Sequence, residues 1–280
     1  MMKDQIINAM SVDVEDYFQV SAFEKIISRT DWDSIKHRVD GNTNKILDIF
    51  TKNNIKATFF MLGWVAERYP NLVKRIIAEG HELASHGYEH IRATEQTPEE
   101  FRCDVIKTKN ILEDISGMEV KGYRAPSYSI GVKNLWAIDE LADAGYRYSS
   151  SIYPIRHDLY GMPDAPRFVF RHQKCQLLEV PITTVLFSGR KMPCGGGGFF
   201  RLFPYAYSKW AINRVNESDK QSANFYFHPW EIDIEQPRFN NAPLKSRFRH
   251  YLNINKMERR LQQLMRDFNW NRMDNVFLID

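Results

Sequence analysis

Cysteine is scarce in this chain, and its spacing excludes two kinds of cross-linked protein. The 280 residues include three cysteines, Cys103, Cys175 and Cys194, which are odd in number and stand far apart. Zinc-binding cysteines usually come in closely spaced pairs, and a disulfide framework uses an even number. The sequence therefore predicts a protein of a reducing compartment without a disulfide framework.

Long apolar runs are absent as well. No uninterrupted run approaches the ~20 residues that cross a bilayer. The first five residues lack the basic start, apolar middle and small-residue cleavage site of a secretory signal. We therefore expect a cytoplasmic protein with no transmembrane segment.

A strong excess of charge is also missing. The formal net charge is +3, with 26% charged and 43% hydrophobic residues. This balance argues against a nucleic-acid partner and is ordinary for a soluble protein with one large core, or a core with an appendage. Basic residues are enriched only near the C-terminus. A solvated helix face is the simpler interpretation there, and contact with a polyanion is the alternative. The basic residues in this region are Lys245, Arg247, Arg249, Arg259, Arg260 and Arg266.

Strand-like and helix-like segments alternate in the first half of the chain. Pro70 marks the start of one helix, and Thr97 with Glu100 forms a capping box at the start of another. Alternation of this kind predicts a parallel sheet with outer helices, either a barrel or an open sheet. Strands are expected at 6–14, 56–63, 81–85, 121–126 and 146–153, and helices at 44–53, 64–78, 97–116 and 132–144.

The alternation of strand-like and helix-like segments ends after Pro154. Two strands are expected next, with an antiparallel pairing as one option, and two further helices and strands follow. We find no internal repeat, no low-complexity tract and no convincing linker. The expected strands are 167–171, 176–187, 225–231 and 276–279, and the expected helices are 205–215 and 255–268.

Polar clusters stand where several of these strands end. Two histidines, His86 and His90, follow the third strand, and with a carboxylate they would complete a site that leaves one position for water. Such a pair alone is often an ordinary surface or core feature. The functional interpretation is favoured because strand ends are where active sites collect in parallel sheets. The other clusters are Asp13-Val14-Glu15-Asp16, Arg124-Ala125-Pro126 and Ser149-Ser150-Ser151.

Two later features are less specific. Four glycines, 195–198, lack the following Lys-Ser or Lys-Thr and the helix start of a phosphate-binding loop, so we expect a flexible loop at the rim of a cleft. Arg201 follows that tract and is a candidate to meet an anionic or hydroxylated ligand. His228, at a strand end before Pro229, is either a satisfied core histidine or a functional one.

Taken together and in this order, these clusters resemble the polysaccharide deacetylases with a NodB homology domain, carbohydrate esterase family 4. The four motifs correspond to Ser11–Asp16, Ser85–His90, Arg124–Pro126 and His228. The forms Asp-Val-Glu-Asp-Tyr-Phe from Asp13 and Phe-His-Pro-Trp-Glu from Phe227 are similar to deacetylases found with exopolysaccharide and exosortase gene clusters. The resemblance implies a single domain over 1–280, with a family-specific C-terminal extension from about 190 to 280.

The resemblance also implies a fold and a chemistry. The expected α/β fold is a distorted (β/α) barrel with seven or eight strands. The expected cofactor is a divalent metal, usually zinc, and the reaction is hydrolysis of N-acetyl groups on sugars. Implied catalytic roles are Asp13 as general base, Arg124 as its partner and His228 as proton donor. His86 and His90 are the implied metal ligands, with Glu15 or Asp16, and the implied substrate-binding residues are Pro126, Tyr128, Arg201 and Trp230.

This sequence departs from the family pattern at two places. The usual adjacent aspartates are replaced by Asp13-Val14-Glu15-Asp16, so either Glu15 or Asp16 is the ligand. If those two residues instead replace the pair directly, Glu15 becomes the base. The aspartate that pairs with the catalytic histidine in many members is also missing, which leaves Glu231 or Asp233 as the partner of His228.

The predicted substrate is an acetylated exopolysaccharide or its lipid-linked precursor, handled by an enzyme peripheral to a membrane-bound synthesis complex. The alternatives are an allantoinase-like hydrolase of a small cyclic amide and a non-catalytic carbohydrate-binding relic. A wide groove lined by aromatic residues would favour the saccharide, and a small closed pocket the cyclic amide.

Overall fold

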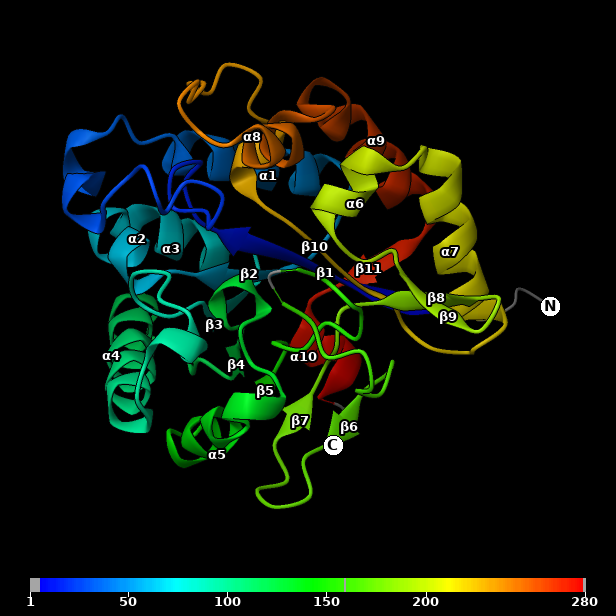
Figure 1. Cartoon of the computed structure of the whole chain (residues 1–280), viewed down its shortest axis with the longest axis horizontal. Coiled ribbons are helices and arrows are strands. Elements are labelled where there is room, and N and C mark those ends of the chain that lie inside the picture. The colour runs from blue at the N-terminus through cyan, green and yellow to red at the C-terminus, as the bar shows by residue number, and fades with distance from the viewer. Residues whose placement is uncertain (1–5, 159, 279–280) are drawn as a thin grey trace.

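A single curled sheet organises the computed structural model, which describes residues 6–158 and 160–278 (Figure 1). The strand order is β10-β1-β2-β3-β4-β5-β7-β6, and β11 adds to β1. All neighbours are parallel except β6 and β7. The strands are β1 (Ile7–Val14), β2 (Thr58–Met61), β3 (Glu82–Ser85), β4 (Gly122–Tyr123), β5 (Tyr148–Ser149), β6 (Phe170–Arg171), β7 (Leu178–Glu179), β10 (Asn224–Phe227) and β11 (Asn269–Asn271). The predicted distorted α/β barrel is confirmed.

Most helices lie around the outside of this sheet, with α2–α5 to the left and lower left, α8 at the top, and α6, α7 and α9 to the upper right in Figure 1. The predicted capping box is present at the start of α4, and Pro70 begins α3. None of the helices in the described ranges has both the length and the apolar character needed to cross a membrane. The helices are α1 (Val39–Lys52), α2 (Gly63–Arg68), α3 (Pro70–Ala78), α4 (Pro98–Ser116), α5 (Trp136–Asp143), α6 (Gly197–Leu202), α7 (Tyr205–Glu217), α8 (Leu244–Tyr251), α9 (Ile254–Asp267) and α10 (Met273–Phe277).

Hydrogen bonds that mostly involve side chains join the two flanks of the curled sheet. The Asn224 amide, at the start of β10, donates to Ser150 Oγ at 3.0 Å and to the carbonyls of Val180 and Pro181, both at 3.2 Å. The backbone N–H of Asn224 donates to Thr183 Oγ1 at 2.6 Å. Because Val180 directly follows β7, these bonds hold β10 against the β5–β7 side and close the curl.

The short helix α10 covers the N-terminal ends of β2 and β3. The backbone N–H of Met273 donates to Thr58 Oγ1 at 2.7 Å, and that of Asp274 to Glu82 Oε2 at 3.1 Å. The predicted closing strand at 276–279 is therefore wrong: residues 273–277 are helical and the added strand is β11, while Ile279 lies outside the described residues. A short apolar run fits a buried helical turn as well as a strand.

The region from 167 to 203 also differs in part from expectation. The predicted antiparallel pair is β6 with β7, but residues 184–187 form a separate strand, β8 (Thr184–Phe187), which pairs with β9 (Arg190–Pro193). The glycine tract was expected to be a flexible loop, but a helix begins within it. Gly195 accepts the N–H of Tyr226 at 2.8 Å, and α6 begins at Gly197. Short 3₁₀ turns complete the chain at Arg29–Ser34, Ala93–Glu95, Pro126–Tyr128, Val132–Asn134 and Pro229–Ile232.

Candidate active site

Three buried side chains converge at the C-terminal ends of β1 and β3. Glu15, His86 and His90 offer ligand atoms that all lie within 4.8 Å of one another. His86 Nδ1 is 2.8 Å from the Arg124 carbonyl, which accepts its proton and leaves Nε2 free to bind a metal. His90 has a φ of 55°, in the left-handed region that residues other than glycine adopt at a cost. The local fold holds this histidine in the cluster.

The cluster fits a divalent cation. His90 Nε2 lies 2.9 Å from Glu15 Oε2, yet that buried oxygen accepts no hydrogen bond of acceptable geometry. Burial would raise the pKa of Glu15, but the charges of His90 and His228 lower it to about 2. An ionised carboxylate and two imidazoles are a donor set that zinc uses in catalytic sites, with a fourth position left open.

Asp16 is turned away from this cluster. Its Oδ1 accepts the N–H of Tyr17 at 2.8 Å, and its Oδ2 accepts the N–H groups of Arg38 at 2.6 Å and Val39 at 3.0 Å. Asp16 therefore satisfies backbone donors at the start of α1. Of the two predicted ligand candidates, only Glu15 points toward the histidines, so the assignment of Asp16 as a metal ligand is corrected.

A second buried pair lies beside the cluster. Arg124 Nη1 and Asp13 Oδ1 are 2.5 Å apart, and both side chains are almost completely buried. The other guanidinium nitrogens donate to the Ser150 carbonyl at 3.2 Å and to Ser150 Oγ at 3.0 Å. The serine run is therefore part of the support for Arg124, which orients Asp13.

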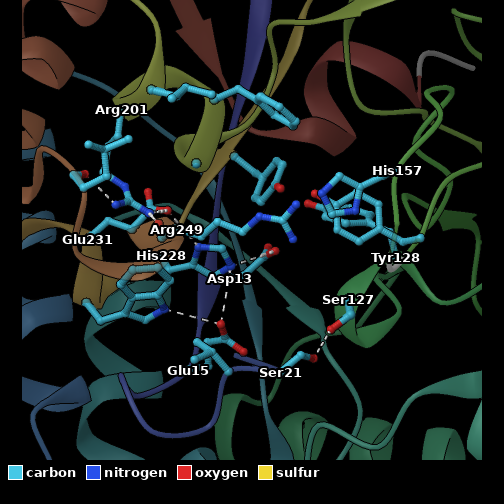
Figure 2. Close-up of a pocket in the computed structure, with 18 of the residues that line it drawn as sticks. Asp13, Glu15, Ser21, Ser127, Tyr128, His157, Arg201, His228, Glu231 and Arg249 are labelled. Carbon is cyan, nitrogen blue, oxygen red and sulfur yellow. Dashed lines mark hydrogen bonds and ion pairs between the residues drawn. The ribbon is translucent and has the colours of Figure 1, made fainter. Parts of the chain in front are cut away.

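His228 faces three carboxylates from the end of β10 (Figure 2). Its Nδ1 is 3.4 Å from Glu231 Oε1, and its Nε2 is 3.4 Å from Glu15 Oε1 and 4.0 Å from Asp13 Oδ2. Burial would lower the pKa of His228, but Glu15 and then Glu231 raise it to about 9. These carboxylates favour the protonated imidazole, which is the form that can donate a proton.

Glu231, and not Asp233, is the partner of His228. Asp233 is instead bound by the guanidinium of Arg38. Trp230 lies between His228 and Glu231 in the sequence. Its ring stacks on His228 with 5.1 Å between ring centroids, and its Nε1 donates to Glu15 Oε1 at 3.4 Å. The histidine is thus held by a carboxylate at one edge and by an indole on its face.

Arg201 has a role in addition to the one predicted. Its Nη1 donates to the carbonyls of His250 at 2.8 Å and Leu252 at 2.7 Å, and its Nη2 lies 3.4 Å from Glu231 Oε1 (Figure 2). The side chain is buried, and these acceptors bind its two terminal nitrogens, whereas Nε has no hydrogen-bond partner among the described residues. Arg201 therefore holds the connection between α8 and α9 next to Glu231. It also lines the cavity described below, and its contact with a ligand stays a prediction.

A cavity of about 500 Å³ lies above these groups. Tyr128 and Trp230, two of the residues that the resemblance implies for substrate binding, line it. Pro126 is not among the lining residues of the described chain. Ser127 and Tyr128 both have positive φ, 54° and 51°, so the turn after Arg124 is strained in a way that is common at active sites.

Several cavity-lining residues had no sequence signal that marked them. Tyr226 had one, because it stands two residues before His228 on the same face of β10. Others come from segments without a motif. They are His157, Tyr160, Phe248 and Leu252. Lys245 and Arg249 belong to the basic residues near the C-terminus, and Phe199 and Leu202 follow the glycine tract.

Two family models together match nearly the whole chain. The polysaccharide deacetylase model matches residues 29–149, and a domain of unknown function, DUF3473, matches residues 150–278. The chain is thus similar to the polysaccharide deacetylases over residues 29–149. The second model covers the region that supplies His228, Glu231 and the C-terminal side of the cavity.

Curated relatives align over part of their length. A peptidoglycan-N-acetylglucosamine deacetylase of Bacillus cereus is 42% identical over 99 residues, which is 35% of this chain and 36% of the relative. A chitooligosaccharide deacetylase of Bradyrhizobium sp. is 29% identical over 100 residues, 36% of this chain and 43% of the relative. The alignments thus span less than half of the length of each relative.

Solved structures share the fold over the full chain. A crystal structure from Mycobacterium smegmatis, assigned as a polysaccharide deacetylase, has a TM-score of 0.63 at 18% identity and covers 99% of this chain and 90% of that one. A CE4 family pseudoenzyme from Bacillus anthracis has a TM-score of 0.50 at 14% identity. The match covers 98% of this chain and 66% of that one. At these identities the likeness establishes the fold.

Proposed function

We propose that the protein is a metal-dependent deacetylase that hydrolyses N-acetyl groups of an exopolysaccharide or of its lipid-linked oligosaccharide precursor. The observation that carries this proposal is the meeting of three groups at the base of one cavity. These are the Glu15, His86 and His90 cluster, the Asp13–Arg124 pair and the His228–Glu231 pair. Together they provide a metal site, a general base and a general acid.

When bound at the cluster, a divalent ion, which we propose to be zinc, would polarise the acetyl carbonyl and lower the pKa of water. Asp13 then takes a proton from the attacking water, and Arg124 keeps its carboxylate oriented. The C–N bond breaks, and His228 gives its proton to the leaving amine, so that acetate and a free amine are released. Tyr128, in its strained turn at the cavity wall, is placed to face the developing oxyanion.

The shape of the cavity supports a saccharide over a small cyclic amide. Its rim includes Phe248 and Leu202, which are 58% and 43% exposed, so the cavity opens to solvent. Its walls carry several tyrosines, and aromatic rings are suited to packing against sugar rings. The names of the relatives, which refer to peptidoglycan and chitooligosaccharide, point in the same direction.

The test is acetate release from an N-acetylated oligosaccharide, measured with and without a chelator and after Zn²⁺ is added back. The proposal predicts release that the chelator abolishes and Zn²⁺ restores. No release by protein that holds one metal per chain would point to another amide substrate. No release together with no metal binding would favour the non-catalytic carbohydrate-binding alternative.

A further inference from the structure

Helix α8 presents large apolar side chains to solvent at the mouth of the cavity. Leu244 and Phe248 are one turn apart, on the same side of the helix, and are 79% and 58% exposed. Leu202, from α6, lines the same cavity as Phe248 and is 43% exposed. We call these three residues the apolar rim. Single exposed apolar residues are common, but a group at the mouth of a cavity marks a binding surface.

Two cations lie beside the apolar rim. Lys245 and Arg249, also one turn apart on α8, line the cavity and share one carboxylate, Asp158, at 2.5 Å and 3.0 Å. Figure 2 shows the Arg249 side chain extending across the cavity toward His157. Since two positive charges meet one negative charge, this side of the cavity keeps a net positive charge.

The chemical groups change from the base of the cavity outward. The metal-ligand cluster and His228 lie at the base, Lys245 and Arg249 line the wall, and Leu244 extends the apolar surface beyond the lining residues. A neutral polysaccharide has no group that would match exposed leucines and a pair of cations. A molecule that carries sugar, phosphate and hydrocarbon in that order matches all three parts.

We infer that the substrate is a saccharide linked through a diphosphate to a polyprenyl lipid. The acetylated sugar reaches the cluster, the diphosphate meets Lys245 and Arg249, and the first isoprene units cover the apolar rim. This inference rests on the proposed function, because it selects the lipid-linked form among the substrates of the same site.

The test compares one N-acetylated oligosaccharide in three forms: free, as a diphosphate, and as a polyprenyl diphosphate in detergent micelles. We expect kcat/KM for acetate release to rise about tenfold or more with each addition, since each new contact buries a separate part of the protein surface. Phe248→Ser combined with Leu244→Ser should remove the gain from the lipid. Lys245→Gln combined with Arg249→Gln should remove the gain from the diphosphate.

Val132→Ser is the matched control, because Val132 is 73% exposed and does not line this cavity. It should leave all three kcat/KM values unchanged. Equal kcat/KM for the three forms would overturn the inference while leaving the deacetylase function intact. The inference would also be overturned if the protein bound phosphatidylglycerol vesicles and phosphatidylcholine vesicles with equal affinity. The apolar rim would then be a surface that contacts membranes in general.

Titration calorimetry with the metal-loaded protein separates the two proposals. Tight binding of the polyprenyl form that is weakened by the Phe248→Ser and Leu244→Ser substitutions, without acetate release, would support the lipid site and contradict the deacetylase function. Acetate release from the free sugar, with no tighter binding of the lipid form, would contradict the lipid site alone.

Discussion

Gly197 packs directly against the carboxylate of Glu231. A Cβ atom added at Gly197 would overlap both carboxylate oxygens, so a larger residue at the start of α6 fits only if Glu231 moves. Arg201, on the next turn of the same helix, reaches Glu231 Oε1 as well. The glycine tract thus allows a buried helix to approach the residue that orients His228.

Gly197→Ala should therefore impair catalysis. The alanine methyl must push Glu231 away from His228 Nδ1, and a displacement of about 1 Å in a catalytic group can cost on the order of 10²-fold in rate. We expect kcat for acetate release to fall by roughly 10- to 100-fold with one metal still bound per chain. The control is Gly198→Ala, because a Cβ there meets no atom within 4 Å. Equal activity of the two variants would contradict a positioning role for Glu231.

Glu15→Ala and Asp16→Ala should separate metal binding from helix capping. The first variant should lose the metal on dialysis, which metal analysis would show. The second should keep the metal but lose about 1–3 kcal/mol of unfolding free energy, because buried N–H groups of Arg38 and Val39 lose their acceptor. Full metal content in Glu15→Ala would show that this carboxylate is not a ligand.

Asp13→Asn should retain the metal and lose activity. The amide keeps the shape of the side chain but cannot take a proton from water, and general base catalysis is worth about 10²- to 10⁴-fold. The checks are kcat and metal content measured on the same preparation. If the variant lost its metal instead, Asp13 would be a metal ligand and its assignment as the general base would be wrong.

Glu82→Gln should change how stability depends on pH. Burial, and then the nearby charge of Asp274, raise the pKa of Glu82 to about 7, above its usual value of 4.5. The folded protein therefore holds a proton that the unfolded chain releases at lower pH. Stability should fall as the pH rises from about 5 to about 7, and stay lower above that, by on the order of 2–3 kcal/mol.

Urea unfolding at several pH values between 5 and 8 would measure this slope, and Glu82→Gln should flatten it. Glu217→Gln, at an exposed position near the end of α7, should keep the slope of the parent protein. A slope that is the same in the parent and in Glu82→Gln would show that Glu82 does not titrate in this range.

The order of strands and helices in the first half of the chain was predictable because local pattern encodes it. The strand β1 is an almost uninterrupted buried run, and the Thr97–Glu100 capping box begins α4 where the sequence indicates. The spacing of His86 and His90 after β3 likewise brought both imidazoles to one site. In the last part of the chain, the apolar run at 276–278 carried no such information, because a strand and a helical turn bury it equally well.

The sequence by itself thus determined the sheet, its outer helices and the strand ends at which the polar clusters stand. Only the tertiary structure decided which member of each cluster faces the others. Glu15 and Asp16 follow the last residue of β1, where the alternation of a strand ends, so the distant N–H groups of α1 select Asp16 as their acceptor. Glu231 is the partner of His228 because α6 packs beside it, and the cavity wall is completed by residues more than a hundred positions from the histidine pair. Contacts over such separations depend on how the chain packs, which local periodicity does not record.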